Sequence, residues 1–172
     1  MPTLDATVSG ASANSYQDRA AAAAILDNLS GFTAFAATTT TEQDRALISA
    51  ANDLDTLIAW DLSLVGYEPA SVAQMRFFPR IGTYDQHGNV LASTAIPWFV
   101  LQAHAMQANA RLVADRTADT ARGIRRVKAG EVEVEMDSVA TGVRRTVSDA
   151  VREFLARWMA SDNFLTAKIA RA

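Results

Sequence analysis

Few side chains in this 172-residue chain could act as acid–base catalysts. It has only two histidines, His87 in a stretch rich in polar residues and His104 among alanines. A catalytic serine, cysteine or threonine needs a base positioned beside it. Neither histidine stands in a pattern that would provide one, so we expect both to be structural or solvated.

Two pairs of carboxylates lie close in sequence, Asp53 with Asp55 and Asp115 with Asp119. Asp53 and Asp55 cannot share a helical face, because residues two apart point about 200° from each other. Asp115 and Asp119 can share one, but like charges four apart on a helix are usually only solvated. We expect neither pair to work as a general acid and base.

Metal and cofactor sites are equally hard to find in the sequence. The chain has no cysteine, which excludes disulfides, thiolate catalysis and cysteine-based zinc sites. Its eight glycines stand singly, so there is no phosphate-binding loop or dinucleotide fingerprint, and no HExxH motif occurs. Glu131, Glu133 and Glu135 could attract a divalent cation, but pairing with the basic residues just before them is the favoured interpretation. We predict that the protein is not an enzyme and holds no cofactor or metal.

Nucleic acid binding is the remaining chemistry that the residues allow. A basic cluster precedes the three glutamates, and two further arginines could lie near it: Arg122, Arg125, Arg126 and Lys128, with Arg144 and Arg145. Proteins that bind single strands combine such charges with aromatic side chains on which bases stack. No aromatic residue interleaves this cluster, so single-stranded DNA binding stays open as an alternative function.

Charge is distributed unevenly along the chain. The net charge is −5 over residues 1–60, −1 over residues 61–121 and +3 over residues 122–172. Complementary charges on two surfaces fix the orientation in which they meet. The pattern therefore favours head-to-tail contact between copies, although chance scatter would also produce it.

Hydrophobic periodicity predicts four helices. The first is expected over Gly10–Asn28 with Ser9 as its N-cap, and the second after a cap among Thr39–Thr41. The second has the clearest buried stripe, formed by Leu47, Ile48, Ala51, Leu54 and Ile58. The third should start near Pro97, because proline suits the first position of a helix, and run to Asp115. The fourth is expected over Val147–Ala160, capped by Thr146 or Ser148.

Between the last two helices the period changes to two. Val132, Val134 and Met136 alternate with the three glutamates, as in a half-buried strand, and the segment Ile124–Lys128 is a second extended candidate. Opposite charges would then face each other across a β-hairpin at about 123–136 and help to set its register. Further upstream, residues 74–82 are expected to be extended and partly buried, and residues 85–89 to form a surface turn.

The expected fold is mainly α: a small bundle of about four helices with one inserted hairpin. We predict a helical domain over residues 1–160 and a C-terminal tail over residues 161–172. No apolar stretch approaches the roughly 20 residues that a membrane span requires. The N-terminal residues lack the basic and apolar blocks of a signal peptide.

The order of motifs resembles a phage family of head–tail connectors (adaptors), often labelled DnaT-like single-stranded DNA-binding. Four stretches carry the resemblance and span about residues 7–160: Thr7-Val8-Ser9 with Ala13 and Tyr16; Ala46-Leu47-Ile48 with Asp55 and Trp60; Phe78-Pro79-Arg80-Ile81-Gly82 followed by Ile96-Pro97; and Gly123-Ile124 with Val127 to Glu135. The sequence departs from the family pattern at Ser12, where an acidic residue is usual, and its tail after Ala160 is longer than expected.

The resemblance implies a structural subunit of the virion, assembled in the host cytoplasm and located in the neck. Such subunits form a ring, typically of twelve copies, beneath the portal protein, and DNA passes through its channel. A further connector or tail-completion protein docks on the far side. Two hypotheses follow. The tail would dock on the portal, through Phe164, Leu165, Lys168, Ile169 and Arg171. The hairpin would contact a neighbouring subunit or border the channel, through Arg125, Arg126, Lys128, Glu131, Glu133 and Glu135.

Overall fold

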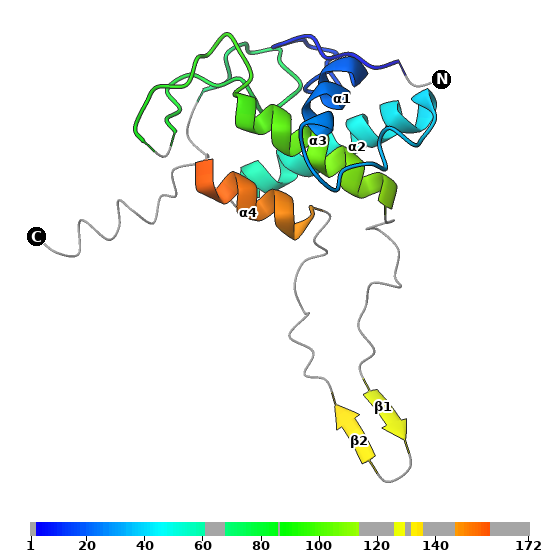
Figure 1. Cartoon of the computed structure of the whole chain (residues 1–172). Coiled ribbons are helices and arrows are strands. Elements are labelled where there is room, and N and C mark those ends of the chain that lie inside the picture. Colours follow the sequence, from blue (N-terminus) through cyan, green and yellow to red (C-terminus); the bar gives the residue numbers. More distant parts are fainter. Residues whose placement is uncertain are drawn as a thin grey trace, which may run out of the picture.

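The computed structural model describes residues 3–60, 68–85, 87–113, 126–129, 132–135 and 147–158. In this part the chain forms four helices and two short strands (Figure 1): α1 Arg19–Asp27, α2 Thr40–Trp60, α3 Trp98–Val113, β1 Arg126–Ala129, β2 Val132–Glu135 and α4 Asp149–Trp158. Helix α3 is central, because it packs against each of the other three helices. The protein is mainly helical, as the sequence predicts.

Helix α2 begins where the sequence places it, because its first turn carries a capping box. The Thr39 amide donates to the Glu42 carboxylate over 3.0 Å, and the Glu42 amide donates back to the Thr39 hydroxyl over 3.4 Å. This reciprocal pair satisfies backbone N–H groups that a helix start leaves without a partner. Four residues of the predicted stripe are fully buried, namely Leu47, Ala51, Leu54 and Ile58, while Ile48 is partly buried.

The first helix is much shorter than predicted, and Ser9 is not its cap. Ser9 has a positive φ of 58° in a turn, and α1 starts at Arg19 with Asp18 as N-cap, whose carboxylate accepts from the Ala21 amide at 2.8 Å. The residues between do not form a helix, because Tyr16 and Gln17 are buried against other elements. Tertiary contacts therefore override the local helix propensity.

Helix α3 starts one residue after Pro97, as the preference of proline for helix starts indicates. The segment before it, residues 68–97, lies on the same side of the helices as the N-terminal segment (Figure 1), and the Met75 amide donates to Gly10 O over 3.1 Å. The predicted surface turn at residues 85–89 is confirmed, since the Asp85 carboxylate accepts from the His87 and Asn89 amides, both at 2.8 Å.

Strands β1 and β2 pair antiparallel within the range where the sequence predicts a hairpin. The register places Arg126 opposite Glu135 and Lys128 opposite Glu133. Within the described residues the two strands pair with each other and contact none of the helices.

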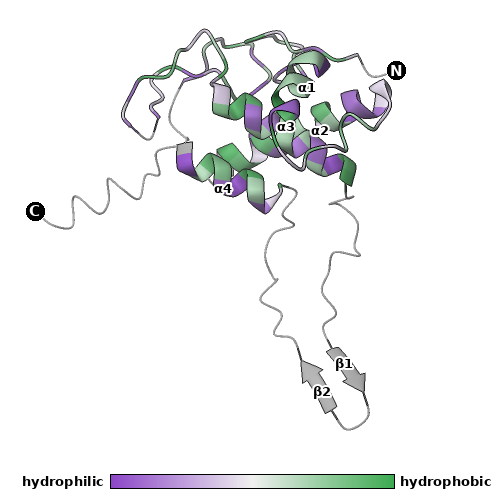
Figure 2. Ribbon diagram, viewed as in Figure 1, coloured by the Kyte–Doolittle hydropathy of each residue, from purple (hydrophilic) through white to green (hydrophobic). Residues whose placement is uncertain are grey.

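Helix α4 is capped by Ser148, one of the two predicted caps, whose hydroxyl accepts from the Val151 amide at 3.3 Å. Its buried residues Val151 and Leu155 join the main hydrophobic core with parts of α2 and α3. Figure 2 shows hydrophobic and hydrophilic residues alternating along the helices, which is typical of amphipathic helices around a shared core. Among the described helices, none combines the length and apolar character that crossing a membrane needs.

Candidate functional site

Three of the stretches that carry the family resemblance meet at the carboxylate of Asp55. This residue lies near the end of α2. Its carboxylate accepts a short hydrogen bond from the buried Tyr16 hydroxyl, which in turn accepts from the Phe78 amide at 3.4 Å. The Phe77 amide donates to Asp55 Oδ1 over 3.3 Å. One carboxylate therefore joins the N-terminal segment, α2 and the loop around Phe78.

Arg76 completes the ring of donors around this carboxylate. Its Nη1 lies 3.2 Å from Asp55 Oδ2 and 2.8 Å from Asn52 Oδ1, and its Nε donates to Ala13 O over 3.1 Å. The Arg76 side chain is only 12% exposed. Its guanidinium thus has partners on both α2 and the N-terminal segment, so its role is mainly to hold the loop in place.

The loop is also shaped from inside by the side-chain amide of Gln74. Its Oε1 accepts from the Ser71 amide at 3.0 Å, and its Nε2 lies 2.9 Å from Arg76 O, 3.2 Å from Phe77 O and 2.9 Å from Pro79 O. One polar side chain therefore lies within hydrogen-bond distance of four backbone groups between residues 71 and 79. This fixes where the side chains of the loop point.

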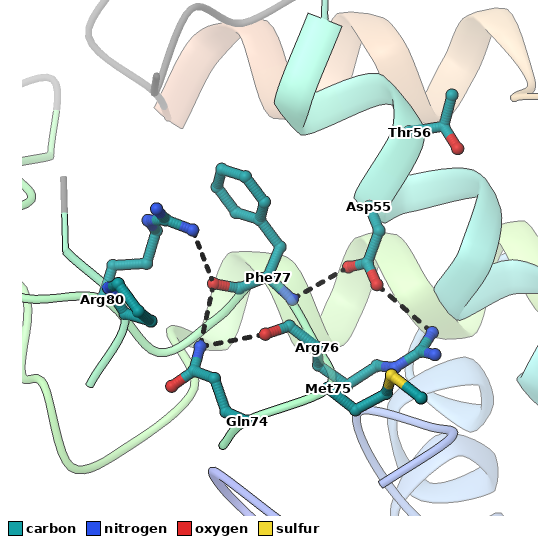
Figure 3. A pocket seen from close by; sticks show the side chains of 8 residues that line it. Asp55, Thr56, Gln74, Met75, Arg76, Phe77 and Arg80 are labelled. Carbon is teal, nitrogen blue, oxygen red and sulfur yellow. Dashed lines mark hydrogen bonds and ion pairs between the residues drawn. The ribbon is translucent and has the colours of Figure 1, made fainter. Parts of the chain in front are cut away.

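Between α2 and this loop lies an open pocket of about 420 Å³ (Figure 3), lined by Asp55, Thr56, Pro69, Gln74, Met75, Arg76, Phe77 and Arg80. The Arg80 guanidinium carbon sits 4.1 Å from the centre of the Phe77 ring, and Arg80 Nη1 donates to Phe77 O over 3.5 Å. A guanidinium over an aromatic face is a cation–π pair. We call this pair the Arg80–Phe77 platform.

Burial sets the electrostatics of the pocket. It raises the pKa of Asp55, although the hydrogen bonds from Tyr16 and Phe77 and the charge of Arg76 oppose it. Burial next to Asp55 also raises the pKa of Tyr16 well above its usual value. Burial lowers the pKa of Arg80. The platform thus holds a cation that is partly withdrawn from water.

The side chains that line the pocket are polar, charged and apolar. Its residues offer guanidinium, carboxylate, amide and aromatic groups, with no nucleophile beside a histidine base. Over the residues that the structure describes, no cluster of three or more histidine, aspartate or glutamate side chains could hold a metal ion. The guanidinium of Arg80 can pair with an anion, and its flat face can stack on a ring.

Most of the residues predicted to contact partners fall outside the part of the chain that the structure describes. This applies to Phe164, Leu165, Lys168, Ile169 and Arg171 of the tail, and to Arg125 and Glu131 of the hairpin. Arg126, Lys128, Glu133 and Glu135 belong to the two strands, which contact none of the four helices. Gln74, Arg76, Phe77 and Arg80 are not among the residues that the sequence predicts to bind a partner. The available signal was two phenylalanines and two arginines within five residues.

The two histidines lie apart from this pocket. His104 is fully buried, and its Nε2 lies 2.9 Å from Leu47 O. His87 is exposed in the turn that Asp85 organises. Asp53 and Asp55 do point to different partners, as their spacing predicts, with Asp53 bound to α3 instead.

Comparison with known proteins gives one family. A family described as "Putative DnaT-like ssDNA binding protein" matches residues 4–172, nearly the whole chain. The chain belongs to this family. The match includes the pocket, the hairpin and the tail. No curated protein and no solved structure matches the chain.

Proposed function

We propose that the protein binds single-stranded DNA and that the Arg80–Phe77 platform is a contact point for the strand. The family's description names this ligand class. The observation that carries the location is the guanidinium of Arg80 held 4.1 Å over the Phe77 ring at the edge of an open pocket. Flat cationic and aromatic groups are the surfaces on which bases of any sequence stack.

The distribution of charge along the chain favours a DNA contact that is limited to a small part of the surface. The first 60 residues carry a net charge of −5, which repels a polyanion. The Arg80 guanidinium lies over the Phe77 ring among the residues that line the pocket, where it could meet a phosphate or a base. The net charge of +3 after residue 121, with Arg126 and Lys128 on β1, supplies a second basic region that a longer strand could reach.

Fluorescence anisotropy with a labelled oligothymidylate tests this proposal. Losing one stacked base costs about 1–3 kcal/mol, so Arg80→Ala should weaken binding by roughly 5- to 150-fold. Each phosphate contact on a single strand contributes about 0.7 to the slope of log affinity against log salt. Arg80→Lys should keep that slope yet lose affinity, because a lysine keeps the charge but not the flat stacking surface.

Arg45→Ala is the matched control. Arg45 is exposed on α2, ten residues before Asp55, or about 15 Å along the helix axis. Arg45→Ala removes one positive charge, as Arg80→Ala does, but at a site outside the pocket. It should therefore change the affinity for DNA little. Equal losses for Arg45→Ala and Arg80→Ala would mean that only net charge matters, and absent binding by the wild type would reject the proposal.

A second candidate function is the connector subunit that the family resemblance implies. Six of the eight large hydrophobic side chains that are exposed in the described residues fall in one segment: Val72, Met75, Ile81, Tyr84, Val90 and Trp98. Exposed apolar side chains that gather on one segment favour a contact surface for another protein. The partners would be further copies in a ring, twelve in number as the resemblance implies, a portal protein and the next connector or tail-completion protein.

Mass measurement of the purified protein, alone and with a portal protein, tests this second candidate. A ring of copies in the absence of DNA would support it, and a monomer under every condition would contradict it. Deleting residues 162–172 should abolish portal binding if the tail docks there. Reversing Glu131, Glu133 and Glu135 to lysine should impair assembly if the hairpin contacts a neighbour. Unchanged portal binding after the deletion would mean that the tail does not dock there. Normal assembly after the charge reversal would mean that the hairpin does not contact a neighbour.

A further inference from the structure

A buried polar network links three helices beside the residues that flank the segment bearing β1 and β2. Asp53 on α2 is 6% exposed. Its Oδ2 accepts from Gln107 Nε2 and from Arg111 Nε, both at 2.7 Å, and its Oδ1 receives a second, short bond from Arg111 Nη2. Gln107 and Arg111 both belong to α3, one turn apart.

The network continues into α4. Gln107 Oε1 accepts from the Ser148 amide at 3.0 Å, and Gln107 itself is fully buried. Ser148 then starts α4, since its carbonyl accepts from the Arg152 amide at 3.1 Å. A continuous path of hydrogen bonds therefore runs from the carboxylate of Asp53, through the amide of Gln107, to the cap of α4.

The residues of this network lie on both sides of residues 114–146 in the sequence. Arg111 lies two residues before the end of α3 at Val113, and Ser148 lies one residue before α4. Everything between, residues 114–146, includes β1 and β2 and the basic residues Arg126 and Lys128. The first flank is bonded to the Asp53 carboxylate through Arg111. The second flank is joined to the same carboxylate through Gln107.

We infer that Asp53 is a positioning residue that holds the two flanks of residues 114–146 at a set separation on the helical body. Apolar contacts could stabilise the same helix packing, and replacing a buried ion pair with them is often neutral or better for stability. They would not orient the Gln107 amide toward the Ser148 amide as the Asp53 carboxylate does, because hydrogen bonds to a carboxylate are directional. The inference does not depend on whether the protein binds DNA.

The absence of cysteine makes a direct test possible. Val113 and Ala150 are both exposed and stand on the two flanks. Spin labels on a chain with Val113→Cys and Ala150→Cys should report one narrow distance distribution, which should broaden when Asp53→Asn is added. A distribution that stays equally narrow overturns the inference.

Amide hydrogen exchange separates positioning from general stability. Asp53→Asn should speed exchange at the Ser148 amide by about tenfold or more, as loss of a buried hydrogen bond would, with a much smaller effect at the Asn28 amide, which donates to Ile25 O at the end of α1. Equal acceleration at both amides would mean that Asp53 only stabilises the fold, and the inference would fail.

Asp55→Asn is the matched control, two residues along the same helix. It should speed exchange at the Phe77 amide and leave Ser148 unchanged. If Asp53→Asn does not fold, Gln107→Met keeps the Asp53–Arg111 pair and removes the bonds of Gln107 to Asp53 and to Ser148. In that variant, hydrogen exchange should become faster at the Ser148 amide alone. An unchanged exchange rate at this amide would overturn the inference.

Discussion

The buried His104 predicts how the stability of this protein depends on pH. Burial lowers the pKa of His104 from its ordinary 6.5 to about 4. Its Nε2 donates to Leu47 O, so in the neutral ring Nδ1 is free to accept from Gln17 Nε2 at 3.3 Å. A proton on Nδ1 would meet that amide donor, whose orientation is fixed by a second bond of 2.9 Å to Leu101 O.

The lowered pKa of His104 determines the sign and the size of its effect on the free energy of unfolding. Because the folded protein binds this proton less readily than the unfolded chain, the contribution of His104 to stability is present above pH 6.5 and is lost as the pH falls toward 4. A shift of this size corresponds to about 3 kcal/mol between the two ends of the window. Urea unfolding at several pH values between 4 and 7 measures it.

His104→Gln should be less stable at pH 7, because it removes a packed ring, but its stability should vary much less over this window. His87→Gln, which changes the histidine of the exposed turn, is the control and should keep the slope of the wild type. If His104→Gln kept that slope too, the reasoning from burial and the Gln17 contact would be refuted.

Further predictions concern the network around Asp55 and the start of α2. Tyr16→Phe removes the hydroxyl that donates to Asp55 and accepts from Phe78, and should lower the free energy of unfolding by about 1.5–3 kcal/mol; an unchanged urea midpoint would contradict this. Burial raises the pKa of Asp55, so its contribution is present below pH 3.8 and lost as the pH rises through its folded pKa. The stability of the wild type relative to Asp55→Asn should therefore fall as the pH rises, and a rise would refute the assignment. Thr39→Ala should cost about 1 kcal/mol by removing the cap of α2, measured as the shift in thermal midpoint.

Local signals in the sequence explain why α2 and α4 were predicted well. Residue type and position narrow the caps to Thr39–Thr41 and to Thr146 or Ser148, and each group is followed by a periodic apolar stripe. The first helix fails this test, because Tyr16 stands in a helix-favouring stretch but donates to a carboxylate 39 residues away. Contacts at that separation leave no local pattern.

The sequence does not predict the pocket, because the pocket also depends on contacts between distant residues. The sequence shows the Phe78-Pro79-Arg80 motif but not that Gln74 binds four backbone groups around it. The stacking of Arg80 on Phe77 depends on that loop geometry. Spacing correctly separated Asp53 from Asp55, yet it could not assign Asp53 to Gln107 and Arg111, since both partners lie on another helix.

The most direct test of the account is to titrate the isotope-labelled protein with an oligothymidylate and map the NMR shift changes. The account predicts that changes concentrate at residues 69–80, including the Nε–H signal of Arg80, and that they weaken strongly in Arg80→Ala. Changes confined to other parts of the chain, or none at all at low salt, would contradict the proposal that this pocket binds single-stranded DNA.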